Sequence, residues 1–247
     1  MLKNNLYICE IFKVYDHEKN NFSHSDTMSD LPPLISHLSV ALTADGSKTL
    51  YSGRFGEHYH STFGAVSESK HVFIEAGYLA TAVHPSSVLE AGFGAGLNAW
   101  LTLQQAGRLR RYTRYETIEL YPIDECTVCK LSNDDIFRNL HTAPWEQQVE
   151  ITPHFVLHKR KNDLLQAAFF HKYDVVYFDA FSPAVQPEMW TTDIFVRLYA
   201  AMNLGAILTT YCAKGSVRRN MQSVGFDVER LPGPEGKREI LRARKTY

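Results

Sequence analysis

The stretch Ser87 to Asn98, which reads SVLEAGFGAGLN, constrains the fold of this chain more than any other. An apolar pair precedes the acid Glu90, and glycines then follow at every second position, Gly92, Gly94 and Gly96. A buried parallel strand that turns sharply into a helix needs this pattern, because glycine permits the tight backbone and lets a ligand approach the main chain. We therefore expect a strand, a ligand-binding turn and a helix. A glycine-rich turn without a ligand is the alternative.

The spacing of these glycines discriminates between cofactors. Dinucleotide sites use G-x-G-x-x-G, whose third small residue would fall at position 97, where this chain has Leu97. The observed E-x-G-x-G-x-G resembles instead the first motif of S-adenosylmethionine (SAM) methyltransferases, whose ligand has no pyrophosphate to seat. This resemblance implies SAM as the cofactor.

Length and composition indicate an ordinary globular chain. Its 247 residues are 45% hydrophobic with a net charge of −1, which fits one large domain or one domain with an extension. No apolar run approaches the ~20 residues of a membrane span, and charges interrupt the apolar part of the N-terminus, so we expect neither a membrane anchor nor a signal peptide. The four scattered cysteines favour a reducing cytoplasm, and the single Cys126/Cys129 pair does not predict a metal site.

Strands and helices are predicted to alternate after a polar N-terminal extension, residues 1–42, and the domain proper spans 43–247. The predicted strands are 88–91, 115–120, 149–157, 173–178, 206–211, 226–231 and 239–244, and the main helices are 97–106, 163–171, 193–202 and 216–224. The loop Pro232 to Gly236 is too short for a helical crossover, so the last two strands must be antiparallel. This layout predicts an α/β, Rossmann-like fold with a mostly parallel seven-stranded sheet and an antiparallel C-terminal hairpin, as in class I SAM-dependent methyltransferases.

Acidic residues at the carboxyl ends of these strands are the candidate ligand contacts, since open α/β sheets bind ligands there. Glu119 can accept hydrogen bonds from both ribose hydroxyls of a nucleoside cofactor, and Glu116 is its competitor in the same strand. Asp163 is placed to meet an adenine amino group, or to cap the helix that we expect after it.

A second informative stretch is YFDAFSPAVQPEMW, residues 177–190. Asp179 closes an otherwise apolar strand and so emerges at the rim of the sheet, with Phe181 and Trp190 nearby. A carboxylate beside aromatic side chains suits an amine acceptor. The alternative is that Asp179 only caps the segment that follows.

These motifs together resemble a known family. YFDAFSPAVQPEMW, TYCAKGSVRR and LPGPEGKRE follow EAGFGAGLN and IELYP in an order similar to the bacterial tRNA methyltransferases that finish 5-methylaminomethyl-2-thiouridine, the MnmD and MnmC methyltransferase type. The similarity covers about residues 43 to 245. Some members carry a fused flavin oxidase, and the resemblance here is to the stand-alone form.

The resemblance implies methylation of the aminomethyl group of 5-aminomethyl-(2-thio)uridine at the tRNA wobble position, with SAM as donor. It implies cofactor contacts at Glu90, Gly92, Gly94, Gly96 and Glu119, to which we add Asp163. At the acceptor it implies Asp179 and Phe181, with Tyr51, Ser52 and Glu68 closing the pocket.

The implied chemistry assigns roles to further residues. Asp179 would orient the amine and accept its proton, and the extruded base would rest on Phe181 or Trp190. The phosphates of the tRNA anticodon region would be held by basic residues near the C-terminus: Arg218, Arg219, Lys237 and Arg238. Two other functions remain open, a polyamine aminopropyltransferase and a SAM- or tRNA-binding protein without catalysis.

Overall fold

A computed structural model describes residues 38–247 of the chain. Within that range the strands form a small three-stranded sheet and a large eight-stranded sheet. The small sheet has the order β1 (Leu38–Leu42), β2 (Lys48–Ser52), β3 (Glu57–His58). β1 lies before residue 43, where the sequence places the start of the domain, and it pairs antiparallel with β2. The remainder of the predicted extension lies outside the described residues.

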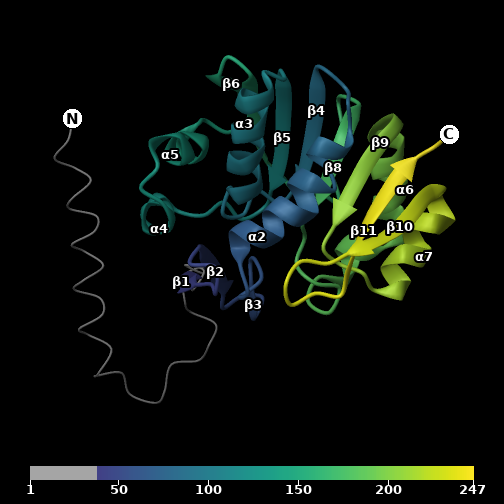
Figure 1. The fold of residues 1–247 in the computed structure, drawn as a ribbon, viewed down its shortest axis with the longest axis horizontal. Coiled ribbons are helices and arrows are strands. Elements are labelled where there is room, and N and C mark those ends of the chain that lie inside the picture. The colour runs from purple at the N-terminus through teal and green to yellow at the C-terminus, as the bar shows by residue number, and fades with distance from the viewer. Residues whose placement is uncertain (1–37) are drawn as a thin grey trace. The chain divides into compact units, whose positions relative to one another are not determined.

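The large sheet has the order β10-β11-β9-β8-β4-β5-β7-β6 (Figure 1). Its strands are β4 (Ser86–Ala91), β5 (Thr113–Glu119), β6 (Gln148–Thr152), β7 (Phe155–Lys161), β8 (Tyr173–Phe178), β9 (Met202–Thr210), β10 (Phe226–Pro232) and β11 (Glu239–Lys245). The pairs from β7 to β9 are parallel, and β10, β11 and β9 are joined antiparallel, as the sequence predicts. The chain runs outward from β4 to β7 and then returns to β8 on the other side of β4. A ligand site is therefore expected at the carboxyl ends of β4 and β8.

Helices cover both faces of the large sheet. They are α2 (Ala65–Ser69), α3 (Leu97–Leu109), α4 (Glu125–Leu131), α5 (Asp135–Thr142), α6 (Thr192–Ala201) and α7 (Gly215–Val224), with short turns η1 (Lys70–Glu75), η2 (Tyr78–Ala80) and η3 (Pro187–Trp190). Gly225 ends α7 with a φ of 112°, the left-handed cap that the sequence predicts. Among the described residues, every helix is too short or too polar to span a bilayer.

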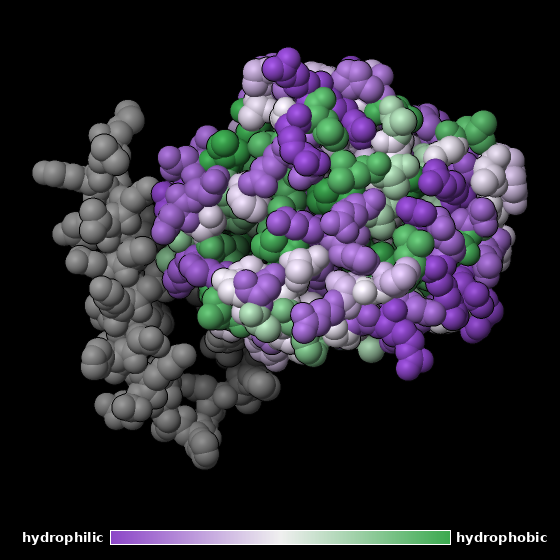
Figure 2. All heavy atoms as spheres, in the orientation of Figure 1, coloured by the Kyte–Doolittle hydropathy of each residue, from purple (hydrophilic) through white to green (hydrophobic). Residues whose placement is uncertain are grey.

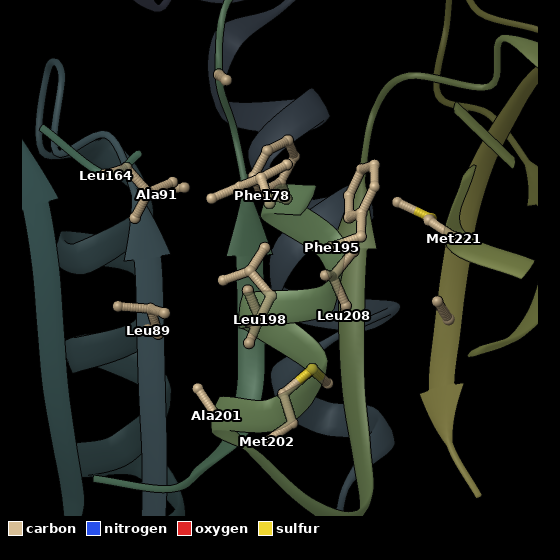
Figure 3. Close-up of a cluster of buried hydrophobic side chains, with 14 of the residues drawn as sticks. Leu89, Ala91, Leu164, Phe178, Phe195, Leu198, Ala201, Met202, Leu208 and Met221 are labelled. Carbon is tan, nitrogen blue, oxygen red and sulfur yellow. The ribbon is translucent and has the colours of Figure 1, made fainter. Parts of the chain in front are cut away.

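Two apolar layers hold the helices to the sheet, because successive side chains of a strand point to opposite faces. Leu89 and Phe178 pack with Phe195 and Leu198 of α6, as Figure 3 shows. On the other face, Val88 and its neighbours pack against α3 and η1. Glu90 lies two positions after Val88 and therefore faces the α3 side. Hydrophilic side chains cover most of the surface on the viewed side, with apolar ones gathered near its middle (Figure 2).

The predicted strand 149–157 is wrong in extent, because the chain turns within it. β6 and β7 form an antiparallel pair with a shift in register between Glu150 and Thr152. Pro153, which has no N–H to donate to a ladder, occupies the turn between them. The extra strand β6 makes the sheet eight-stranded where seven strands were predicted.

The predicted helix 163–171 is also wrong, since this segment is irregular after a turn at residues 164–166. Its carbonyl groups find other donors. Arg197 of α6 donates to the carbonyls of Leu164, Leu165 and Ala167, and Arg160 donates to that of Ala168. Two guanidinium groups thus satisfy the acceptors that helical N–H groups would have satisfied.

Candidate functional site

The three alternate glycines form the loop between β4 and α3. Their φ angles are +91° at Gly92, +49° at Gly94 and +72° at Gly96, a left-handed backbone that other residues rarely adopt. A Cβ at Gly94 would lie 3.0 Å from Cδ1 of Tyr59, and one at Gly96 would lie 2.7 Å from Nε2 of His141. Conformation therefore favours glycine at all three positions, and close packing adds to this at Gly94 and Gly96.

A cavity of about 650 Å³ opens at this edge of the sheet, a size typical of small-molecule sites. It lies at the carboxyl ends of β4, β5, β7 and β8, where the topology predicts a ligand. The predicted site residues that line it are Gly92, Gly94, Glu119, Asp163, Glu68, Asp179, Phe181 and Lys237. Those outside its lining are Glu90, Gly96, Tyr51, Ser52, Trp190, Arg218, Arg219 and Arg238.

Glu119 stabilises the part of the cavity beside the glycine loop, which we call the cofactor end. Its Oε2 accepts a hydrogen bond from the N–H of Gly94 at 2.9 Å, and its Oε1 accepts one from the N–H of Tyr121 at 2.7 Å. A carboxylate has about four acceptor sites, so both oxygens keep capacity for ligand hydroxyls. The competing Glu116 is buried away from the cavity in an ion pair with Arg160 at 2.9 Å.

Asp163 lines the same end although no helix follows it. Its Oδ1 accepts the N–H of Leu165 at 2.9 Å, so the carboxylate caps a turn rather than a helix. The expected helix cap is therefore wrong, and a contact between Asp163 and the adenine amino group stays a prediction that its place in the cavity lining permits.

Glu90 lies in a buried polar cluster beside the loop, only 1% exposed. Within residues 38–247 neither of its carboxylate oxygens has a hydrogen-bond partner, and the same is true of Asn98 Oδ1 and the hydroxyls of Tyr115 and Thr117. Burial, followed by the nearby charge of Asp179, raises the pKa of Glu90 well above its usual range. Burial thus favours the neutral form of Glu90, and its side chain is not part of the cavity lining.

Asp179 follows β8 and faces the cavity. Its Oδ2 accepts a hydrogen bond from Nδ2 of Asn98 at 2.8 Å. Burial, with the charge of Glu68 second, raises the pKa of Asp179 to about 7, while Asn98 and Lys237 act in the opposite direction. The carboxyl group therefore exchanges its proton near neutral pH, as a general base must.

Asn98 is a candidate functional residue that sequence reasoning missed. It belongs to the first turn of α3, two positions after Gly96, and is 3% exposed. It joins the glycine loop to Asp179, so the cofactor and acceptor ends share one hydrogen-bonded group. The sequence signal was an amide two positions after the last glycine.

Two charged residues from distant segments meet in the part of the cavity that contains Asp179, which we call the acceptor end. Glu68 of α2 accepts a hydrogen bond from Lys237 of the β10–β11 loop, and its other oxygen accepts the N–H of Ser61 at 2.6 Å. The ammonium of Lys237 also lies 4.1 Å from the ring centroid of Tyr211. Burial lowers the pKa of the adjacent His60 to about 4, so this imidazole is neutral.

Residues 53–61, which we call the strap, contribute seven of the residues that line the cavity. Glu57 accepts hydrogen bonds from the hydroxyl and the N–H of Ser182, at 2.5 and 3.2 Å. Phe55 stacks on Phe181 with ring centroids 4.3 Å apart, and Tyr59 meets the same ring edge-on at 5.2 Å. Phe55 and Glu57 were not singled out from the sequence, because only the fold brings them to the motif of Asp179.

The predicted residues outside the cavity support its walls instead. Trp190 is buried and donates its indole N–H to the carbonyl of Phe181 at 2.8 Å, so it positions Phe181 and cannot itself receive a base. Ser52 accepts the N–H of Phe55 at 3.3 Å, and Tyr51 packs against His58. These two residues shape the start of the strap.

The basic residues of the C-terminal part divide into two kinds. Arg219 and Arg238 are exposed and Arg218 is half-buried, and all three lie outside the cavity lining. Lys237 instead lines the cavity. Within residues 38–247, no group of three or more His, Cys, Asp or Glu side chains is arranged to hold a metal ion.

Sequence comparisons identify relatives of this chain. A family model described as S-adenosyl-L-methionine-dependent methyltransferase matches residues 137–246. The tRNA 5-methylaminomethyl-2-thiouridine biosynthesis bifunctional protein MnmC of Nitrosospira multiformis is 32% identical over 213 residues, 78% of this chain and 34% of the relative. The protein of the same name from Pseudomonas putida is 28% identical over 233 residues, 85% of this chain and 35% of the relative. The chain thus spans about a third of the length of these relatives.

Structural comparisons support the fold. The crystal structure of MNMC2 from Aquifex aeolicus matches with a TM-score of 0.73 and 24% identity, over 99% of this chain and 86% of that one. The spermidine synthase of Thermotoga maritima matches with a TM-score of 0.58 and 12% identity, over 84% and 69% of the two chains. Both share the class I α/β architecture, which confirms the predicted fold class.

Proposed function

Because this chain belongs to the S-adenosyl-L-methionine-dependent methyltransferase family, we propose that it methylates the aminomethyl group of 5-aminomethyl-(2-thio)uridine at the wobble position of tRNA. SAM is the methyl donor of the family. The observation that carries the proposal is the placement of Asp179, a carboxyl group in the same cavity as the glycine loop. The names of the full-length relatives supply the substrate class.

The residues of the cofactor end fit SAM. The left-handed glycines leave the main chain open above Gly92, where the nearest atom to an added Cβ is 3.6 Å away. Glu119 would accept the ribose hydroxyls with its remaining lone pairs, and Asp163 would accept the adenine amino group. Glu90 and Gly96 support the loop from behind and contribute no direct contact in this proposal.

Catalysis in this proposal rests on positioning and on one proton transfer. When bound, SAM supplies an already activated methyl group. Asp179 would hold the acceptor amine with the oxygen that Asn98 leaves free, and would take the proton that the amine loses. A carboxyl group whose pKa lies near 7 is well matched to this task, because its basic form is populated at neutral pH.

The strap and the loop after β8 would receive the base. A uridine must leave the anticodon stack to reach Asp179, and the Phe55–Phe181 pair offers the aromatic surface on which it would rest. Arg218, Arg219 and Arg238 would hold tRNA phosphates. The cytoplasmic location favoured by the cysteine usage stays a prediction.

The test is incubation of the protein with SAM and tRNA that carries the aminomethyl group, followed by mass spectrometry of the nucleosides. We expect one added methyl on the aminomethyl-uridine, and none on an unmodified transcript, which lacks the nucleophile. Aminopropyl transfer to polyamine precursors from decarboxylated SAM, with no change in the tRNA, would establish the aminopropyltransferase alternative. Binding of SAM and tRNA without any product would indicate a non-catalytic protein.

A further inference from the structure

The ion pair between Glu68 and Lys237 connects two segments that lie 169 residues apart in the sequence. Glu68 is 6% exposed, and both residues line the cavity that contains Asp179. Lys237 is additionally fixed over the ring of Tyr211, and Glu68 by the N–H of Ser61. The pair therefore belongs to the wall of the cavity and not to the outer surface.

This geometry separates Lys237 from its neighbour Arg238. The sequence assigns both residues to tRNA phosphates, and only Arg238 is exposed and outside the cavity lining. A phosphate that captured Lys237 would leave the carboxylate of Glu68 buried without a counter-ion, which is strongly unfavourable. Phosphate binding is therefore an unfavourable role for Lys237.

The pair also determines the charge around Asp179. The charged and titratable groups that face Asp179 come from five elements: Glu68 of α2, Glu90 of β4, Tyr115 of β5, Tyr211 after β9, and Lys237 of the β10–β11 loop. Burial raises the pKa of Glu90 and so favours its neutral form, and it likewise raises the pKa values of Tyr115 and Tyr211, which keeps both phenols protonated. Glu68 and Lys237 are thus the two full charges that act on Asp179, with opposite signs.

Resting on the function proposed above, we propose that Lys237 is a positioning residue of the acceptor site, whose ammonium neutralises Glu68 and so lets Asp179 act as a carboxylate. Without Lys237, two buried carboxyl groups would face each other across the acceptor site and would compete to stay charged. A proton retained by that pair would leave Asp179 unable to accept one from the amine. Lys237 thereby controls the protonation of Asp179 without touching the reacting atoms.

The first test needs neither SAM nor tRNA. Carbon-13 NMR of labelled aspartate and glutamate side chains follows the titration of Asp179, with its signal assigned from Asp179→Asn. We expect Lys237→Met to produce a two-step titration of the coupled pair, with the upper step about one pH unit above the wild-type midpoint. Glu68→Gln should move the midpoint down, and the double variant should return it close to the wild-type value.

Matched variants make this test decisive. Lys237→Arg keeps the charge and should retain the wild-type titration. Arg238→Met removes a neighbouring charge outside the cavity and should leave the titration unchanged. If Lys237→Met folds and the titration midpoint of Asp179 is unaltered, the proposal is overturned. If Lys237→Met does not fold, an unaltered midpoint in Glu68→Gln overturns it.

The second test uses tRNA. Arg238→Met should lower by about one the slope of log affinity against log salt, because one phosphate contact is lost. Lys237→Met should leave that slope unchanged and move the pH profile of methyl transfer upward, with Lys237→Arg restoring it. A reduced salt slope in Lys237→Met would instead assign Lys237 to phosphate. If no tRNA is methylated, the function proposed above fails, and the NMR titration still decides the role of the pair.

Discussion

The two ends of the cavity are built in different ways. The cofactor end consists mainly of backbone from one continuous stretch, Gly92 to Gly96, braced by Glu119 at the end of the neighbouring strand. The acceptor end is assembled from side chains of three distant segments, around Glu68, Asp179 and Lys237. One end thus depends on local conformation, and the other depends on the tertiary fold. Substitutions at the two ends should therefore fail in different ways.

The largest effect is expected at the cofactor end, from Gly94→Val. A branched side chain at a φ of +49° is strained, and its Cβ would lie 3.0 Å from Tyr59. We expect SAM affinity to fall by about a hundredfold or more, measured by calorimetry, with the fold retained. Gly107→Ala in α3 is the matched control, since nothing lies within 4 Å of its added Cβ, and its affinity should equal that of wild type. Unchanged binding in Gly94→Val would contradict a backbone-built cofactor site.

A smaller effect is expected where the fold itself holds Asp163 in place. Arg197→Met removes the donor for three carbonyls of the segment 164–167, the residues that directly follow Asp163. We expect the free energy of unfolding to fall by about 2 kcal/mol, measured by denaturant titration. Arg219→Met, at an exposed position, is the control and should change stability little. Equal stability of the two variants would mean that Arg197 does not organise this segment.

The smallest effect is expected at the aromatic wall of the acceptor end. Phe181→Ala removes the ring that stacks on Phe55, and a base stack of this kind is worth about tenfold in affinity. The KM for tRNA should rise by about that factor while calorimetric SAM affinity stays constant. Phe170→Ala, an exposed ring elsewhere, should change neither value. Weakened SAM binding in Phe181→Ala would show that the two ends are not separable.

The same contrast explains what the sequence could predict. Glycine spacing, apolar runs and Gly225 predicted β4, α3 and α7 because these features act within a few residues. The prediction of a helix at 163–171 was wrong because Arg197 and Arg160, distant in sequence, donate hydrogen bonds to the carbonyls of that segment. The single strand 149–157 failed although Pro153 marked its turn.

Site prediction followed the same rule. Glu119 and Asp179 were placed in the cavity from their positions at strand ends. Trp190 was assigned to the base although it is buried behind Phe181, and Lys237 was assigned to phosphate although it pairs with Glu68. Asn98, Phe55 and Glu57 were missed, because their partners come from other segments. Residue type and spacing report local chemistry, and only the fold shows which groups meet.

The most direct test of the account is the single-turnover rate of Asp179→Asn on aminomethyl-bearing tRNA, measured across pH. Asparagine keeps the shape but cannot accept the proton, so we predict a rate about a hundredfold or more below wild type at neutral pH, with SAM affinity nearly unchanged. Because the pKa of Asp179 is about 7, the wild-type rate should rise as pH increases through that value. The variant should recover part of its loss at high pH, where more of the amine is neutral without help. A rate near wild type at neutral pH would remove Asp179 from the mechanism and leave it a loop cap.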